Sequence, residues 1–316
     1  MSNGDNMKKI LSILLGALLL SGCSEKALHK YSMTATDIGF DTVVSFTAYT
    51  ENEAAFNSYS AELKKQFRYY DRLFDKYNSY DGVNNIKTIN DNAGRQPVEV
   101  EPVILDLLKL AKAYDTISNH QFDITMGSVL NIWHDYREAG TLANQKHKES
   151  SIPSMKELQT AAKHSGWKHV QIDEKNSTVY IDDRDVSLDV GGVAKGYAVE
   201  LIADHRQKDG LQHAIINGGG NIRLIGDKPD NEAWSVGIQI PNLKAQSTDS
   251  LISVKSKGDT YFVTSGDCQR YYKYKGKIMH LIFYPATLMR ARPSCSVQVI
   301  TDKCVLADIL TKTLYK

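Results

Sequence analysis

Large apolar residues in the first part of the chain recur with two different periods. Residues 42–49 have a strand-like pattern. From Phe56 to Phe74, apolar and aromatic residues return every three or four positions, which is the spacing of an amphipathic helix. The same spacing predicts a second helix at 102–117, and the residues 77–94 between them, rich in Asn, Asp and Gly, predict a loop. Aromatic residues along one helix face commonly pack in a core, so we interpret them as structural.

The rest of the chain mixes short strands with helices. An apolar segment at 122–133 is followed by a polar insertion at 134–153. Beyond these, the spacing of apolar residues predicts strands at 179–181, 186–190, 234–240 and 297–301, and helices at 156–164, at 193–201 and from Cys304 onward. Strands and helices do not alternate regularly. The pattern therefore predicts an α+β fold with mixed, largely antiparallel sheets and packed helices.

The apolar run at 11–23 closes on Leu20-Ser21-Gly22-Cys23 and follows Lys8 and Lys9. It is shorter than the roughly 20 residues that a membrane span needs, and its positive flank and small residues are typical of a signal peptide. A cysteine after Ser-Gly resembles the bacterial lipoprotein signal, in which this cysteine is lipidated and becomes the new N-terminus. We expect a signal peptide at 1–23 ending at a lipidated Cys23, a tether at 24–33, and attachment to the extracytoplasmic face of the cell membrane. The alternative is an ordinary secretory peptide with a chance cysteine.

Composition narrows the possible functions. Of the 316 residues, 42% are apolar, which is enough for a large core. The 38 basic and 37 acidic residues give a net charge of +1, so the chain has no surplus of positive charge for a phosphate backbone and nucleic acid is not an expected partner. Besides Cys23, the cysteines are Cys268, Cys295 and Cys304, without a CxxC spacing. This predicts neither a disulfide framework nor a thiolate zinc site.

The segment Leu188–Tyr197 runs from a strand through a glycine turn into a helix. Gly191 and Gly192 let the backbone approach a ligand closely, and the N–H groups that open the helix suit an anion. Lys195 adds a cation, and Asp189 offers an oxygen to a hydroxyl or ring nitrogen. The spacing matches neither a P-loop nor a dinucleotide Rossmann motif. Taken alone, the segment is also compatible with a tight turn beside a surface lysine.

Four further segments carry residues of a similar kind. Asn217–Asn221 lies between two strands and offers a row of backbone donors. Thr264–Asp267 closes a strand with two hydroxyls and a glycine, Gln121–Thr125 precedes an apolar run, and Leu306–Asp308 opens the last helix. Each of them alone is compatible with a turn or a cap. Their order along the chain is the specific observation.

That order resembles the family of FAD:protein FMN transferases, the ApbE lipoproteins. The likeness extends from about Thr34 to the end of the chain and includes the lipoprotein signal; the matching residues are Thr42, 122–133, 189–197, 218–221 and 264–267. It implies an ApbE-like, T-fold-related flavin transferase domain at 34–316. It also implies an enzyme that cuts the pyrophosphate of FAD with Mg²⁺ present. Such an enzyme passes FMN to a threonine or serine hydroxyl of an exported electron-transfer protein and releases AMP.

The resemblance further implies which residues do this. Gly192 through its carbonyl and Asp308 through its carboxylate would bind Mg²⁺, and Thr264 and Ser265 would face the flavin. The residues implied to contact FAD are Phe40, Tyr77, Gln121, Phe122, Asp123, Asp189, Lys195, Gly219, Thr264 and Ser265, with Phe122 and Asp123 on the adenine side. Backbone donors, a lysine and a hard cation fit phosphoryl transfer, which depends on positioning and charge neutralisation.

The chain departs from the family pattern at the metal. The third family ligand is a threonine four residues after the aspartate, and here this position is Lys312. A lysine puts a cation where a divalent ion needs an oxygen. Thr311 and Thr313 lie on either side, but one residue along a helix is a rotation of about 100°, so neither can simply replace it.

A second departure concerns the family segment His-Ile-Ile-Asp-Pro, which here reads His280–Pro285. Aligned on the proline, Leu281 replaces the histidine and Tyr284 replaces the aspartate. Aligned on His280, one residue is extra, which a β-bulge could absorb. If His280 points inward, it is the best candidate for the catalytic base that accepts the proton of the acceptor hydroxyl; otherwise it is a solvent-facing histidine.

These departures leave the flavin-contacting segments largely intact, so three functions stay open. The first is the FMN transferase. The second is an FAD pyrophosphatase of the same architecture, which forms FMN and AMP with water as the acceptor. The third is a lipoprotein that holds flavin without turnover, or an unrelated solute-binding lipoprotein.

Overall fold

The structure is a computed structural model, and it describes residues 27–239, 250–266, 271–280, 282–291 and 295–315. Cys23 and the predicted signal peptide lie outside the described residues, as do Asp267, Cys268 and Leu281. Within the described ranges, no helix combines the length and the apolar character that a bilayer crossing requires.

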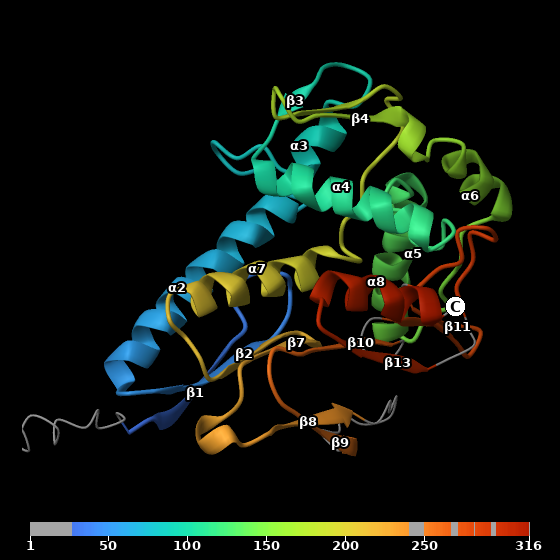
Figure 1. The fold of residues 1–316 in the computed structure, drawn as a ribbon. Helices are drawn as coiled ribbons and strands as arrows, with labels where there is room; N and C mark the ends of the chain where they lie inside the picture. Colours follow the sequence, from blue (N-terminus) through green and yellow to red (C-terminus); the bar gives the residue numbers. More distant parts are fainter. Residues whose placement is uncertain (1–26, 240–249, 267–270, 281, 292–294, 316) are drawn as a thin grey trace, which may run out of the picture.

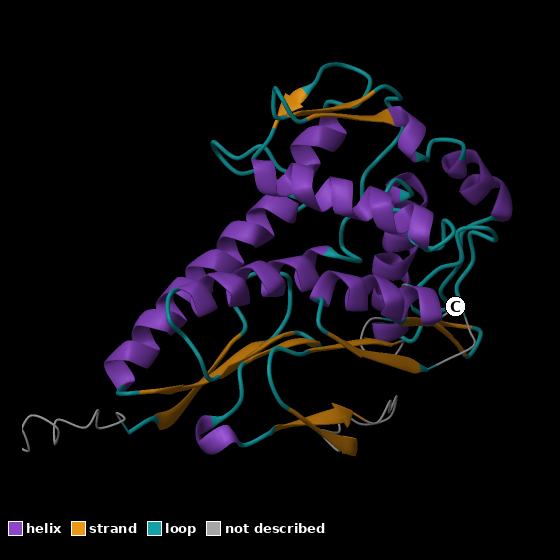
Figure 2. Cartoon of the chain, in the orientation of Figure 1, coloured by secondary structure: helices purple, strands orange, loops and turns teal. Residues whose placement is uncertain are grey.

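A six-stranded antiparallel sheet underlies the molecule (Figures 1 and 2). Its strand order is β1-β2-β6-β7-β10-β13. The strands are β1 (His29–Ala35), β2 (Val44–Thr50), β6 (Ala214–Gly218), β7 (Asn221–Ile225), β10 (Tyr261–Gly266) and β13 (Ser296–Thr301). Every second side chain of β2 and β6 is fully buried, as expected where the two faces of a sheet meet different surroundings.

Three helices cover one face of this sheet (Figure 1). They are α2 (Glu53–Phe74) over β2, α7 (Ala194–Lys208) over β6 and β7, and α8 (Cys304–Leu314) over β10 and β13. Helix α2 begins at Asn52, whose side chain accepts a hydrogen bond from the N–H of Ala55. Its buried stripe includes Phe56, Leu63 and Phe67, whose spacing of seven and four residues keeps them on one helix face.

A smaller unit lies beyond these helices, in the upper part of Figure 1. It contains α3 (Ile86–Asp91), α4 (Pro102–Ile117), α5 (Gly127–Gln145), α6 (Met155–Ala162), the 3₁₀ turn η1 (Trp167–His169), and a sheet of β3 (Val98–Glu99), β5 (Thr178–Ile181) and β4 (Val170–Asp173) in that order. Buried side chains of both units form one continuous core, which includes Phe67 of α2, Leu107 of α4 and Val199 of α7. The two units therefore share one hydrophobic core.

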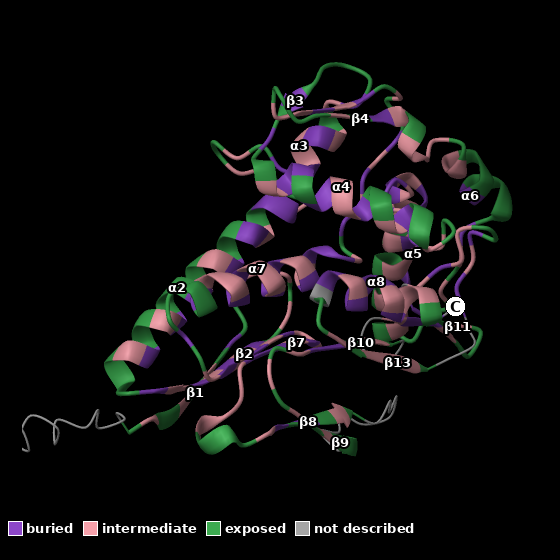
Figure 3. Cartoon of the chain, in the orientation of Figure 1, coloured by how far each residue is buried: buried purple, intermediate pink, exposed green. Residues whose placement is uncertain are grey.

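Two hairpins complete the fold. They are β8 (Trp234–Gln239) with β9 (Ser250–Ser256), preceded by η2 (Pro229–Asn231), and β11 (Tyr272–Tyr274) with β12 (Lys277–Met279). The β8–β9 hairpin lies on the sheet face opposite the helices (Figures 1 and 3). Its Trp234 and Val236 pack on Leu224 and Phe262.

The expected α+β fold with largely antiparallel sheets is confirmed, and four local expectations need correction. Residues 77–94 are not all loop, because α3 forms there. Asn85 and Thr88 cap this helix reciprocally, and Ile86 and Ile89 bury its inner side. The polar insertion at 134–153 is largely a continuation of helix α5 to Gln145.

Residues 186–190 were expected to form a strand, and they do not join a sheet. Leu188 instead exchanges two main-chain hydrogen bonds with the amide side chain of Asn90, at 2.8 and 3.0 Å, and Ser187 bridges Met126 alone. At the other end of the chain, the segment expected as a tether is already in the large sheet from His29 onward.

Candidate functional site

The glycine turn and the last helix lie side by side, as expected for two segments implied to bind the same ion. The N–H of Gly196 in α7 donates to Oδ2 of Asp308 in α8 at 3.2 Å. A Cβ on Gly196 would lie only 2.7 Å from this oxygen, so a glycine is needed for α7 and α8 to approach this closely. Residues 112 positions apart are thereby joined at the start of α7, directly after Gly191 and Gly192.

Lys312 lies between the glycine turn and Asp308. Its Nζ donates to Oδ1 of Asp308 at 2.6 Å and to the main-chain carbonyl of Asp308 at 2.9 Å, one helical turn back. The side chains of Lys312 and Asp308 are 22% and 5% exposed. A Cβ on Gly192 would lie 3.5 Å from both Cδ and Cε of Lys312. The lysine stem therefore packs against Gly192.

The oxygen atoms at this position decide whether a divalent cation fits. Both carboxylate oxygens of Asp308 already accept a hydrogen bond, one of them from an ammonium group. The hydroxyl of Thr311 donates to the Asp308 carbonyl at 2.8 Å and lies 2.7 Å from Oγ of Ser265. Mg²⁺ needs an octahedral set of oxygens, and a neighbouring ammonium repels it. The donor set around Asp308 does not fit a divalent ion, and we derive no step through one.

Asp189 is held by a buried lysine that the sequence analysis missed. Lys76 Nζ lies 2.7 Å from Oδ2 of Asp189 and 2.7 Å from Oδ1 of Asn131, and the N–H of Gly191 donates to Oδ1 of Asp189 at 2.9 Å. Burial opposes the charged form of Lys76, but Asp189 and Tyr77 together outweigh this effect and raise the pKa of Lys76. Lys76 follows the end of α2, and nothing in its local sequence distinguishes it from an ordinary surface lysine.

Tyr77 forms an exposed aromatic edge beside this ion pair. Its ring lies 4.9 Å from the ring of His134, and its hydroxyl is 3.2 Å from His134 Nδ1. Lys76 Nζ is 4.9 Å from the centre of the Tyr77 ring. Burial and the neighbouring Arg137 lower the pKa of His134, so this imidazole is neutral at neutral pH.

The segment implied for the adenine side reaches the glycine turn. Phe122 is buried, and a Cβ on Gly192 would lie 2.9 Å from its Cε2. Burial raises the pKa of the Asp123 carboxyl, although the N–H and hydroxyl of Thr125 donate to Oδ1 at 2.8 and 2.7 Å. Gln121 lies in the turn after α4, where its N–H donates to the carbonyl of Ser118.

Several other residues implied to contact FAD lie in or next to strands of the large sheet, and of these Thr264 was implied for the flavin side. Gly219 has a φ of +63° in the β6–β7 turn, and a Cβ there would lie 1.9 Å from the hydroxyl of Thr42. Thr264 in β10 pairs through its N–H with the Gly220 carbonyl and donates its hydroxyl to Gln298. The ring of Phe40 packs edge-on against Phe67 of α2, on the core side. Lys195 lies half-buried in the first turn of α7.

His280 points inward, which is the first of the two orientations left open by the sequence. The side chain is buried; its Nε2 lies 2.6 Å from the carbonyl of Ala291, and its Nδ1 lies 3.1 Å from the N–H of Ile282. Because a carbonyl only accepts and an N–H only donates, the ring is neutral with its proton on Nε2. To act as a base, Nδ1 would have to give up the hydrogen bond from Ile282.

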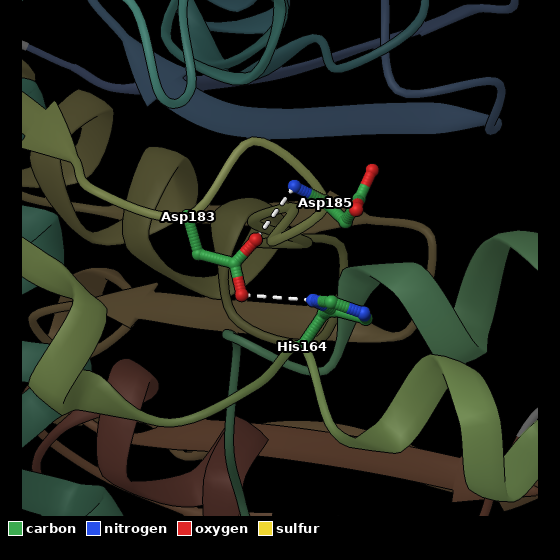
Figure 4. A group of neighbouring side chains, drawn as sticks. All are labelled: His164, Asp183 and Asp185. Atoms are coloured by element: carbon green, nitrogen blue, oxygen red, sulfur yellow. Dashed lines mark hydrogen bonds and ion pairs between the residues drawn. The ribbon is translucent and has the colours of Figure 1, made fainter.

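Three further side chains form the cluster in Figure 4. His164, Asp183 and Asp185 each offer a ligand atom within 4.8 Å of the others. Asp183 Oδ2 lies 2.8 Å from Nδ1 of His164, and its Oδ1 accepts the N–H of Asp185 at 2.9 Å. These hydrogen bonds stabilise the turn before Ser187, which accounts for the cluster. Asp185 faces Asp183 with its main-chain N–H rather than with its carboxylate (Figure 4).

Comparisons with known proteins place the chain in a family. The model of the ApbE family matches residues 40–316. An FAD:protein FMN transferase of Vibrio cholerae is 25% identical, with 98% of this chain and 87% of that protein covered, and one of Klebsiella pneumoniae is 26% identical, with 73% and 67% covered. The crystal structure of the ApbE protein of Thermotoga maritima superposes with a TM-score of 0.76 at 27% identity, covering 91% of this chain and 86% of that one. The flavin transferase ApbE of Vibrio cholerae has the same fold, with a TM-score of 0.71, 22% identity and coverage of 91% and 86%.

Proposed function

Because the chain belongs to the ApbE family, we propose that it is an FAD:protein FMN transferase. In the proposed reaction, the hydroxyl oxygen of a threonine or serine on an acceptor protein attacks the phosphorus of the FMN half of FAD. A new phosphorus–oxygen bond forms, the bond from that phosphorus to the bridging oxygen breaks, and AMP leaves with the bonding electrons. The hydroxyl proton passes to a base or to solvent.

One observation carries the proposal: the segments implied to contact FAD come together although they are far apart in sequence. The glycine turn contacts Phe122 and Lys312, and α8 reaches Ser265 through Thr311. A diphosphate at the start of α7 would lie at the positive end of the helix, with Lys195 in its first turn. Phosphoryl transfer depends mainly on such positioning and charge neutralisation.

The proposed roles of individual residues follow from these contacts. Phe122 and Asp123 would receive the adenine side, and Thr264 and Ser265 the flavin side. Asp189, kept in place by Lys76, would accept a hydrogen bond from a hydroxyl or ring nitrogen of FAD. His280 would serve as the base only after its Nδ1 releases the N–H of Ile282.

We also propose where the protein works and on what. Lipidation of Cys23 would hold it at the extracytoplasmic face of the cell membrane, next to an exported electron-transfer subunit as acceptor. Fractionation of cells that express the full chain tests this. The wild type is expected in the membrane fraction, and Cys23→Ser is expected to lose acylation and leave that fraction. An unchanged distribution of Cys23→Ser would contradict the anchor.

Two alternatives receive support from particular residues. The lysine at position 312 and the fully hydrogen-bonded His280 are compatible with an FAD pyrophosphatase, or with a protein that binds flavin without turnover. Incubation with FAD and an exported acceptor protein separates them. A fluorescent flavin band on a denaturing gel identifies the transferase, free FMN with AMP identifies the pyrophosphatase, and unchanged bound FAD identifies a binding protein. Absence of FAD binding would contradict all three.

A further inference from the structure

We infer that the ammonium group of Lys312 takes the place of a divalent cation, so that this chain binds the diphosphate of FAD without a metal. The inference rests on the proposed function, because it concerns the same site. In the inferred site, Lys312 stabilises the diphosphate in the role that the family resemblance implied for Mg²⁺.

Lys312 contacts both residues that were implied to bind the metal. Its ammonium group lies 2.6 Å from Oδ1 of Asp308, the carboxylate implied to bind the metal, and the lysine stem packs 3.5 Å from the Cβ position of Gly192, the other implied ligand. The charge is therefore bound to one of the two residues that were expected to hold the ion, and its aliphatic stem packs against the other. It comes from the one position at which the family ligand is absent.

Two acceptors on α8 hold the ammonium group in place. Lys312 reaches back one turn along α8 and donates to both the carboxylate and the main-chain carbonyl of Asp308. The N–H of Gly196 fixes the other oxygen of the same carboxylate. An ammonium group has three hydrogens, and these contacts use two of them. Among the contacts of the described residues, the third hydrogen is left for a phosphate oxygen.

The neighbouring hydroxyl of Thr311 is unsuited to a metal. Thr311 is fully buried, and its hydroxyl bonds the Asp308 carbonyl and Ser265. To bind a divalent ion, the site would have to break the Lys312–Asp308 pair and bring the ion next to an ammonium group. At these short distances the repulsion between like charges is large where water is excluded.

In the proposed reaction, the single positive charge of Lys312 would therefore neutralise negative charge on the diphosphate. The ammonium group can donate to an oxygen of the diphosphate in the ground state and to the phosphate of AMP as it leaves. No bond to Lys312 forms or breaks, and its proton stays on Nζ. Lys312 thus contributes through charge and hydrogen bonding alone.

FAD binding by the full chain tests the inference, with quenching of flavin fluorescence as the readout. Each protein is titrated with FAD in EDTA and again in excess Mg²⁺. Wild type is expected to bind with a dissociation constant that changes by less than about twofold between the two conditions. Lys312→Met, which keeps the stem and removes the charge, is expected to bind at least about tenfold more weakly in both. Lys312→Arg should retain most of the affinity in EDTA.

Lys312→Thr is the decisive variant, because it restores an oxygen at the family position. It should bind weakly in EDTA and recover affinity when Mg²⁺ is added. Lys303→Met removes one exposed charge at the start of the same helix and should behave as wild type, and circular dichroism confirms that each variant is folded.

The outcomes separate the inference from the proposed function. Tenfold tighter binding of FAD by the wild type in Mg²⁺ than in EDTA would overturn the inference and leave the transferase proposal intact. Equal binding by wild type and Lys312→Met in EDTA would also overturn it. Failure of the folded wild type to bind FAD under either condition would overturn the proposed function itself.

Discussion

Lys76 and Asp189 form an ion pair 2.7 Å long that joins the end of α2 to the glycine turn, and their side chains are only 7% and 16% exposed. The two residues are 113 positions apart. The pair fixes the carboxylate that precedes the turn, and Gly191 uses the other oxygen of that carboxylate as a hydrogen-bond acceptor. The position of the glycine turn thus depends on Lys76, which lies far from the turn in the sequence.

Removal of Lys76 is expected to destabilise the protein strongly. Lys76→Met leaves Asp189 charged and buried without its partner, which costs about 3–5 kcal/mol in the free energy of unfolding. Lys87 forms a pair of the same length with Asp91 on the surface, so Lys87→Met should cost less than about 1 kcal/mol. Urea denaturation measures both. Equal losses from the two variants would show that burial gives the Lys76–Asp189 pair no special importance.

The close approach of α7 and α8 predicts that Gly196 tolerates no side chain. In Gly196→Ala the new Cβ would lie 2.7 Å from Oδ2 of Asp308, so either the carboxylate or the helix has to move. We expect a loss of about 1–3 kcal/mol in the free energy of unfolding and at least about tenfold weaker FAD binding. Gly258→Ala meets open space, but it places an alanine at a φ of +69°. This control should also lose stability, about 1 kcal/mol, while its FAD affinity stays unchanged.

Asp123 is expected to make stability depend on pH in the acidic range. Its pKa in the folded protein is raised by burial, so folding favours the protonated acid. The free energy of unfolding contributed by this group therefore rises as the pH falls from above the raised value toward the ordinary value for aspartate. Asp123→Asn keeps the acceptor for Thr125 and removes the charge. It should be more stable than wild type at neutral pH and lose this part of the pH dependence.

Thermal unfolding between pH 3 and 8 compares Asp123→Asn with Asp81→Asn, which changes an exposed loop residue. The control should follow the wild-type curve. An Asp123→Asn curve parallel to that of the wild type would mean that the Asp123 carboxyl is not the group whose titration is linked to folding.

The backbone conformation of Leu288 predicts that a glycine variant is more stable than an alanine variant at this position. It has a φ of +56°, a conformation that favours glycine, while its side chain is buried beside Trp133 and Phe283. Leu288→Ala loses the buried side chain and keeps the strained backbone. Leu288→Gly loses the side chain but relieves the strain, so it should be about 1 kcal/mol more stable than Leu288→Ala. Guanidinium denaturation of both variants measures the difference, and a less stable glycine variant would contradict the expectation.

Local patterns identified those elements that bury one regular face. The helix at 102–117 begins at Pro102, which favours a first helical position, and the structure gives it the predicted bounds. Helix α5 was cut short in the prediction because its residues after Trp133 are mostly polar. What holds this part is distant in sequence: the Cβ position of Gly140 lies 2.3 Å from the Tyr272 ring. A short-range pattern cannot contain such a contact.

The site was predictable to the extent that its motifs are continuous in sequence. The turn at Gly191 and Gly192 could be named from residue type and spacing, and the carboxylate of Asp308 from the family resemblance. Lys76 and Asn131 could not, because their role arises only when the fold brings them to Asp189. The direction of His280 depended on strand register, which one extra residue leaves ambiguous until the main-chain partners of the ring are known.

The docking of α8 has a consequence for how the protein matures. This helix is the last element in the described part of the chain, and it alone supplies Asp308 and Thr311 to the contacts at Gly196 and Ser265. A chain still emerging from the ribosome has the glycine turn but lacks its counterpart. The FAD binding proposed above would thus have to wait until α8 has been synthesised and has docked on the turn.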